Sequence, residues 1–496
     1  MSGSVSFQYI PPNLRIPLFW VEFDNSQAGV NRDVQRAVLI GGTLVAHPVA
    51  PVYVASVAQA ISLFGQSSML ARMFQAYLAN DPFGEVWCLP IADPGGGVAA
   101  TIAVTLTGTA TAAGTLSLYI GGQLVQAAVA SGDTPTVQAA ALAAAVNAKL
   151  DVPTLATSAL GVLTLVSDHK GSAMLGLDVR FNYYGAQGAE ALPAGVTAAV
   201  GAASGGTGAP DLSGVAAALG SIDYDFIISG FSDATSLTAL TALMSDSAGR
   251  WSYLNENFGG VFTAKIDTSA NLITFGAAHN DQHALVWGCA GLPSPQWEFA
   301  AAMTAACIPS LKADPARPLQ TLAVNGILAP APVDRFSKST LQSLLSGGIA
   351  QAAFDRSGNV SVLRAVTMYL TNKFGQADQS YLDVETLFTL MAITRRLRSA
   401  ITQKFPRAKL ADDGTRVGFG QPVVTPSIIR GELIAQYASM QWDGLVDDAD
   451  LFAKGLIVVR NDQDPSRVDV LFDPYLVSGL RIFAVLNQFR LAARAA

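Results

Sequence analysis

The chain has 496 residues, which at about 150 residues per domain predicts roughly three domains. Its formal charge of −7 argues against nucleic acid as a partner, and its hydrophobic share of 50% excludes a disordered chain. Charged residues make up only 14%, against about 25% in an average soluble chain. A composition this apolar favours a subunit that covers part of its surface in an assembly.

No segment of the sequence predicts a membrane span or a signal peptide. The densest apolar run, 299–311, is shorter than the roughly 20 residues that a spanning helix needs. The first residues lack the charged start and the apolar core of a signal peptide. Cys88, Cys289 and Cys307 are too few and too scattered for a disulfide framework or a zinc site, so we expect a reducing cytoplasm.

The first 25 residues predict an apolar strand. Prolines at positions 11, 12 and 17 precede a segment, 19–24, in which apolar and polar residues alternate. This alternation is typical of a strand with one apolar face, here Phe19, Val21 and Phe23. Chain ends are usually polar and frayed, so such a strand needs a sheet edge to join. An ordinary first strand of its own domain is an equal alternative.

From Arg36 the pattern changes to strands that alternate with helices. Buried strands are predicted at 36–42, 85–91, 225–229, 261–266 and 284–289. One helix begins at Ser67 or Ser68, another surrounds Leu237 to Met244, and an alanine-rich helix covers about 296–308. Such alternation predicts a parallel, doubly wound sheet. The sheet is split in two, because residues 98–207 have a different composition.

Residues 98–207 predict a mostly β domain inserted into a loop of the α/β domain. They contain only eight charges in 110 positions. Period-two alternation predicts strands, and Gly121-Gly122 predicts a hairpin turn between two of them. A helix is expected at 136–150, and the glycine-rich end, 201–210, has the composition of a flexible linker.

A third unit is predicted from Pro330 onward. A long helix is expected at about 383–403 and a second at about 427–440. The chain then predicts strands at 455–461, 467–472 and about 480–489. The predicted fold class is therefore multidomain: a split doubly wound α/β domain, an inserted mostly β domain, and a C-terminal α+β domain.

Two motifs could support chemistry on the α/β domain, and both have a simpler explanation. His279 and His283 have the i, i+4 spacing of a helical metal pair, but no third ligand accompanies them. Residues 229–234 follow a buried strand, where a doubly wound sheet binds ligands. Ser232 or Asp233 as the cap of the next helix explains this segment without a ligand.

Three further clusters are equally weak as chemical sites. Residues 205–208 resemble a phosphate loop in composition but lack its Lys-Ser/Thr pair. Asp447, Asp448 and Asp450 lack the remainder of a calcium loop and suit a helix start. Three arginines near the end of the long helix either complement the helix dipole or form a face for an acidic partner: Arg395, Arg396 and Arg398. We expect no catalytic residue, no cofactor and no metal.

Residues 13–28, 380–388 and 467–483 each have a recognisable pattern. The first closely resembles the opening of tail sheath proteins of Mu-like contractile phages and prophages. The second resembles the Tyr-x-x-Val segment that opens a helix in the C-terminal domain of contractile sheaths. The third resembles their last two strands. The insert, 98–207, corresponds to the variable region of that family, so the resemblance implies nothing about its detailed fold.

The resemblance implies a structural subunit, not an enzyme, that forms helically stacked hexameric rings around a tail tube. Contraction would drive the tube through the host cell envelope. The implied partners are neighbouring copies, the tail tube protein, and the baseplate and tail terminator proteins, with no nucleic acid and no membrane insertion. The implied location is the virion tail, after assembly in the host cytoplasm. Arg395, Arg396 and Arg398 are the candidate tube-facing residues.

The resemblance also implies that terminal arms add strands to neighbouring subunits. The expected domain division is 1–25 arm, 26–97 and 208–329 α/β domain, 98–207 outer insert, 330–466 tube-proximal domain and 467–496 C-terminal arm. The expected inter-subunit arm residues are Leu18, Phe19, Val21, Phe23, Val468, Val470, Phe472, Leu480 and Ile482. A nucleotide-binding enzyme on a doubly wound sheet and another self-assembling virion or surface protein remain the alternatives.

Overall fold

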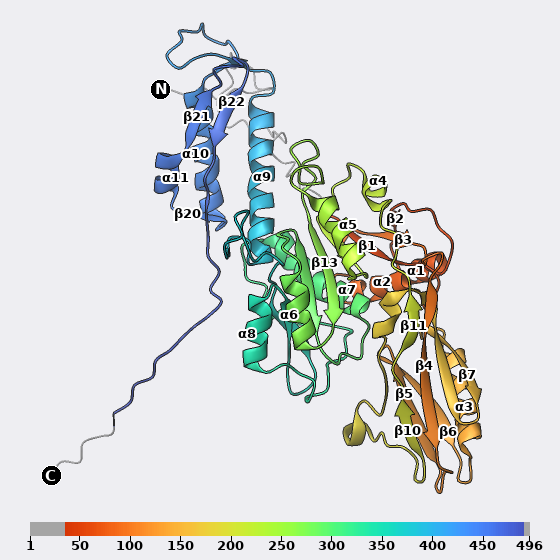
Figure 1. Cartoon of the computed structure of the whole chain (residues 1–496). Helices are drawn as coiled ribbons and strands as arrows, with labels where there is room; N and C mark the ends of the chain where they lie inside the picture. Colours follow the sequence, from red (N-terminus) through yellow and green to blue (C-terminus); the bar gives the residue numbers. More distant parts are fainter. Residues whose placement is uncertain (1–34, 491–496) are drawn as a thin grey trace, which may run out of the picture. The chain divides into compact units, whose positions relative to one another are not determined.

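Nine strands from two separate stretches of the chain form one sheet in the computed structural model, which describes residues 35–490 (Figure 1). The six central strands run parallel, and the three outer ones are antiparallel to their neighbours. Across the sheet the order is β15 (Ala323–Val324), β17 (Val360–Arg364), β16 (Ala350–Phe354), β14 (Ala284–Cys289), β13 (Gly260–Ile266), β12 (Phe226–Ser229), β1 (Ala37–Gly42), β3 (Val86–Ile91) and β2 (Val52–Tyr53).

Helices connect these strands, and their first residues explain where several of them begin. The Ser68 hydroxyl accepts from the Ala71 amide at the start of α2, and the Asp233 carboxylate accepts from the Ser236 amide at the start of α5. Both caps match the positions that the sequence predicts. The helices around the sheet are α1 (Val57–Phe64), α2 (Met69–Leu78), α4 (Val215–Leu219), α5 (Ala234–Met244), α6 (Ser269–Ala277), α7 (Gln296–Ala313) and α8 (Lys338–Ser346).

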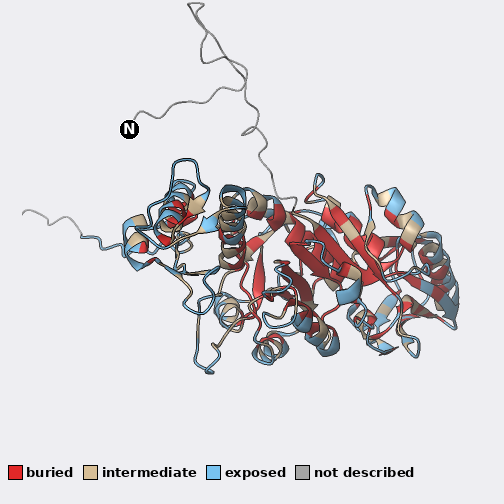
Figure 2. Ribbon diagram, turned by 90° about the horizontal axis from the view of Figure 1, so that it is seen from above, coloured by how far each residue is buried: buried red, intermediate tan, exposed pale blue. Residues whose placement is uncertain are grey.

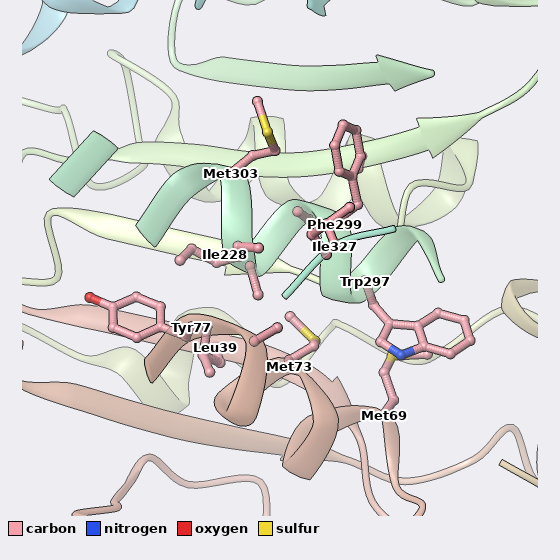
Figure 3. Close-up of a cluster of buried hydrophobic side chains, with 14 of the residues drawn as sticks. Leu39, Met69, Met73, Tyr77, Ile228, Trp297, Phe299, Met303 and Ile327 are labelled. Carbon is pink, nitrogen blue, oxygen red and sulfur yellow. The ribbon is translucent and has the colours of Figure 1, made fainter. Parts of the chain in front are cut away.

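The main core lies where α2 and α7 meet over the middle of the sheet. Figure 3 shows Trp297 of α7 pointing toward Met69 of α2, while Phe299 and Met303 point away from α2 on the other side of α7. Fully burying an apolar side chain of this size contributes about 1.5–3 kcal/mol, so this contact is a large part of the stability. The labelled side chains are Leu39, Met69, Met73, Tyr77, Ile228, Trp297, Phe299, Met303 and Ile327.

Residues between β3 and β12 form two further sheets. Gly121 and Gly122, with φ of 53° and 78°, make the predicted turn between β5 and β6. One sheet has the order β10 (Thr197–Val200), β4 (Val98–Thr107), β8 (Val162–Lys170) and β7 (Thr154–Ala159), with β11 (Ser204–Thr207) also on β4. The other has the order β6 (Gln123–Val129), β5 (Gly114–Ile120) and β9 (Val179–Phe181), and the helix is α3 (Pro135–Ala148).

The segment predicted as a linker, 201–210, contains a strand instead. β11 pairs antiparallel with β4 through Ser204, Gly205 and Thr207. A Cβ on Gly205 would lie 2.7 Å from the Ala99 carbonyl oxygen, and one on Gly206 would lie 2.6 Å from the Leu175 side chain. The glycines are therefore required by close packing at positive φ, a role that composition alone does not distinguish from flexibility.

The long helix α9 (Val384–Lys404) separates two cores. Its first half packs on the nine-stranded sheet, while Ile393 belongs to a smaller cluster. Because β16 and β17 lie in the large sheet, the predicted division between residues 329 and 330 falls inside one structural unit. The remaining elements are β18 (Lys409–Leu410), β19 (Val423–Val424), α10 (Pro426–Trp442), β20 (Val446–Asp447), α11 (Ala449–Gly455), β21 (Ile457–Arg460), β22 (Val468–Leu471) and β23 (Tyr475–Leu476).

Candidate assembly surface

An aromatic cluster holds the C-terminal elements together. The ring of Tyr437 on α10 stacks on Phe452 of α11 with 3.7 Å between centroids, and Phe472 lies 4.8 Å from Phe452. The Tyr437 hydroxyl donates to the Asp447 carbonyl at 2.6 Å and accepts from the Tyr475 amide at 3.0 Å. Phe472, an expected inter-subunit residue, thus packs within its own chain.

Strands β21 and β22 form a hairpin with no third strand among residues 35–490. Four of its apolar residues are between 42% and 58% exposed: Ile457, Val459, Val470 and Leu471. Ile457, Val459 and Leu471 lie on one face of the hairpin. Val458 and its cross-strand partner Val470 lie on the other face, where β21 contacts α10 and Val458 joins the small core. A two-stranded hairpin is marginal by itself, and unpaired edges are templates for another strand. The hairpin, which includes the predicted Val468 and Val470, is therefore a candidate receiving edge.

The chain beyond β23 carries exposed apolar side chains. No strand forms over residues 478–490, although the sequence predicts one at about 480–489. Apolar alternation favours a strand, but a strand also needs a backbone partner, and none of the described residues supplies one here. Residues 482–490 are exposed (Figure 2), whereas Gly479 and Arg481 are of intermediate burial. Six side chains in residues 478–490 are between 70% and 84% exposed: Leu480, Ile482, Phe483, Val485, Leu486 and Phe489.

The tail contacts its own chain through Arg481, which the sequence analysis missed. Its guanidinium lies 3.2 Å from the Asp383 carboxylate and 3.1 Å from that of Glu385, at the start of α9. Arg364 pairs with the same Asp383 at 2.8 Å. A single arginine inside an otherwise apolar run is the one sequence signal that could have indicated a specific contact.

The three arginines of α9 are all paired with carboxylates of their own chain. Arg395 binds Asp225, whose side chain is 1% exposed, at 2.5 Å. Arg396 binds Asp443 at 2.5 Å, and Arg398 pairs with Glu256. The dipole of a helix acts most strongly at its last turn, and all three arginines lie before the last turn of α9. Pairing within the chain is a third explanation, beside the dipole and the acidic partner.

Asp225 shows why one of these pairs differs from the others. Burial raises the pKa of Asp225, and the Arg395 guanidinium opposes this rise. The exposed pairs of Arg396 and Arg398 contribute little because solvent screens them. Arg395 therefore neutralises a buried charge, whereas the other two remain accessible to a partner.

The predicted chemical motifs have structural roles in the described residues. α6 ends at Ala277, so His279 and His283 both lie beyond it and share no helix face. The His279 ring is 2.8 Å from the Phe275 carbonyl oxygen, and His283 lies beside Asp246 at 3.3 Å. No group of three or more metal-ligating side chains is found among residues 35–490.

The remaining candidate residues also have structural roles, either as helix caps or as buried side chains. Asp448 caps α11 by accepting from the Leu451 amide, as expected for a helix start. All three cysteines are buried and free, and burial raises the pKa of Cys289 to about 12. Within the described part of the chain, no helix has both the length and the apolar composition to cross a membrane. The predicted N-terminal arm residues Leu18, Phe19, Val21 and Phe23 lie outside the described residues.

Two family models match consecutive parts of the sequence. The phage tail sheath protein central domain matches residues 205–368, and the phage tail sheath C-terminal domain matches residues 376–490. The Mu-like prophage FluMu tail sheath protein of Haemophilus influenzae is 40% identical over 491 residues, which cover 98% of this chain and 99% of that protein.

Two solved structures align with most of this chain at low sequence identity. The sheath tail protein from Desulfitobacterium hafniense is 13% identical to this chain, with a TM-score of 0.48. The alignment covers 94% of this chain and 97% of that protein's chain. The sheath tail protein from Listeria innocua is 13% identical to this chain, with a TM-score of 0.47. The alignment covers 91% of this chain and 94% of that protein's chain.

Proposed function

The chain belongs to the phage tail sheath protein family, and on that premise we propose how this subunit of a contractile tail sheath is built and joined to its neighbours. The sheath is a virion tail component made by self-assembly. We propose that subunits form stacked hexameric rings around a tail tube, and that contraction drives the tube through the host cell envelope. In this proposal the subunit is not an enzyme.

The proposed connection is strand exchange. The hairpin β21–β22 supports it most strongly. It has exposed apolar residues, and none of residues 35–490 adds a third strand to its edges, so these suit additional strands from other copies. The exposed tail, 482–490, would supply one strand. Residues 12–24 would supply another, since their sequence alternates and has little reason to be apolar at a free end.

The proposed architecture has three parts besides the arms: a split domain, an insert and a C-terminal core that faces the tube. Strands on both sides of the insert share one sheet, which supports a split doubly wound domain that ends near residue 368, where the central-domain match also ends. The insert, 98–207, would be an outer domain. The small aromatic core around Tyr437 would face the tube, and Arg396 and Arg398 would contribute to an acidic tube contact. Baseplate and terminator proteins would bind at the two ends of the polymer, after assembly in the host cytoplasm.

Electron microscopy of the purified chain tests this proposal. We expect long tubes from the full chain and folded, unassembled subunits from a variant that lacks residues 1–24. Circular dichroism on the truncated variant is the control for folding. Tubes of normal length from the truncated variant would contradict the proposed role of the N-terminal arm. Discrete small oligomers with catalytic activity from the full chain would instead favour an enzyme on the doubly wound sheet.

A further inference from the structure

The C-terminal tail is fixed to its own subunit over a short stretch that ends at residue 481. The Gln320 amide group donates to the Leu480 carbonyl at 3.3 Å. Gly479 passes so close to Pro318 that a Cβ there would lie 2.5 Å from the proline ring. Arg481, whose side chain is 15% exposed, then ends this stretch with its two ion pairs.

Glu385 gives this contact its strength. Its side chain is 4% exposed, and one carboxylate oxygen accepts from the Leu319 amide at 3.0 Å and from Arg481. The second oxygen finds no hydrogen-bond partner within residues 35–490. Arg364 binds Asp383 instead, so within the described part of the chain Arg481 is the cation that contacts Glu385. A buried carboxylate without its cation is strongly unfavourable, which favours the tail in this position.

The character of the tail changes directly after Arg481. Residues 482–489 contain no charged side chain, and their large apolar residues are exposed. By contrast, residues 475–481 make a strand pair, a proline contact and ion pairs with the same subunit. The boundary between the fixed and the free part of the tail therefore lies at Arg481.

We propose that Arg481 is the anchor of the C-terminal arm: it holds residues up to 481 on α9 of its own subunit and presents residues 482–490 to a second copy of this chain. This inference rests on the proposed function. Arg481 is a positioning residue, because it acts on where the exchanged segment starts. Nine extended residues span about 30 Å, so the receiving edge of the neighbour must lie within about that distance of the anchor.

Two variants separate positioning from stability. Arg481→Ala leaves Glu385 unpaired, so we expect a lower unfolding temperature. Arg481→Ala with Glu385→Gln removes both charges, and the amide oxygen can still accept from Leu319, so we expect the unfolding temperature to recover. In both variants the arm is released. We expect the critical concentration for tube formation to rise about tenfold or more, because residues that are no longer fixed must be ordered on binding.

A spin label reports the anchor directly in the isolated subunit. The native cysteines are buried, so a cysteine introduced by Ser478→Cys can be labelled selectively. We expect a slow-motion spectrum in the otherwise native chain and a fast-motion spectrum in the double variant. A label at Gln488→Cys should move fast in both. Arg364→Ala is the matched control, since it disturbs the same ion cluster and leaves Arg481 in place.

Two results would show that Arg481 does not anchor the tail. A mobile label at position 478 in the native chain, or a double variant that forms tubes as readily as the native chain, would overturn the anchor. Arg481→Lys should retain part of both readouts, because it keeps a cation beside Glu385. Removal of residues 482–490 tests the proposed function separately. If that truncated chain still forms normal tubes, the exchanged arm is wrong, while the spin-label result continues to decide where the tail is held.

Discussion

Arg72 in α2 and Glu298 in α7 form a buried ion pair, and the same arginine joins the insert to the nine-stranded sheet. Its other guanidinium nitrogens donate to the Asp151 carbonyl at 2.5 Å and the Gly121 carbonyl at 3.2 Å. The side chain of Arg72 is 5% exposed. One guanidinium thus satisfies a buried carboxylate and two carbonyls of the inserted residues.

Loss of Arg72 is expected to be costly. Arg72→Ala leaves Glu298 buried and unpaired, and removal of one partner of such a pair typically costs about 3–5 kcal/mol. Arg467→Ala is the control, because its pair with Asp469 is exposed and solvent screens it, so its loss should change stability far less. Denaturant unfolding of both variants measures the difference. Equal stabilities would show that the Arg72 pair is not important for folding.

Replacement of residues 98–207 by a short Gly/Ser linker tests whether the insert is an outer domain. We expect the remaining chain to fold and form tubes, because loop closure depends only weakly on length. Its stability should be lower, since Arg72 loses two carbonyl acceptors and the Met69 amide loses the His169 ring that accepts from it at 3.0 Å. A folded remainder that cannot assemble would place the insert in the lattice instead.

The arginines of α9 should differ in what their loss does. Arg395→Ala leaves buried Asp225 unpaired, so it should destabilise the subunit far more than Arg398→Ala does. A tube contact is therefore best tested with Arg396→Glu and Arg398→Glu together. We expect weaker assembly on tubes and a smaller salt dependence. Unchanged assembly at low and high salt would mean that both side chains serve only their own subunit.

The anchor predicts a pH dependence of stability. Burial raises the pKa of Glu385 and Arg481 opposes this rise, so Arg481→Ala should raise the folded pKa further above the unfolded value of about 4.3. An acid with a raised folded pKa loses its contribution as pH increases through that pKa. The variant should therefore lose more stability, relative to the native chain, at pH 7 than at about pH 4. If thermal unfolding shows the same loss of stability at the two pH values, the proposed role of the Arg481–Glu385 pair is contradicted.

Local sequence patterns predicted the helices, caps and turns well. They could not predict close contacts between segments that are far apart in the sequence. The Gly121-Gly122 turn, the caps at Ser68 and Asp233 and the long helix α9 depend on neighbouring residues. The strand β11 depends on close packing of glycines against another strand, which composition does not show.

The candidate assembly surface also depends on contacts that the local sequence does not show. Apolar alternation located the tail, but a strand requires a partner that this single chain does not provide among its described residues. The pairs Arg395–Asp225 and Arg481–Glu385 join residues 170 and 96 positions apart, so no local pattern could have indicated them.

Hydrogen exchange on subunits and tubes tests the central claim of strand exchange most directly. In isolated subunits, the outward amides of β21–β22 and those of residues 482–489 should exchange freely, because residues 35–490 supply them with no strand partner. In tubes both segments should become protected together, as added strands pair with the hairpin. Tubes in which both segments still exchange as in the free subunit would contradict strand exchange at these sites.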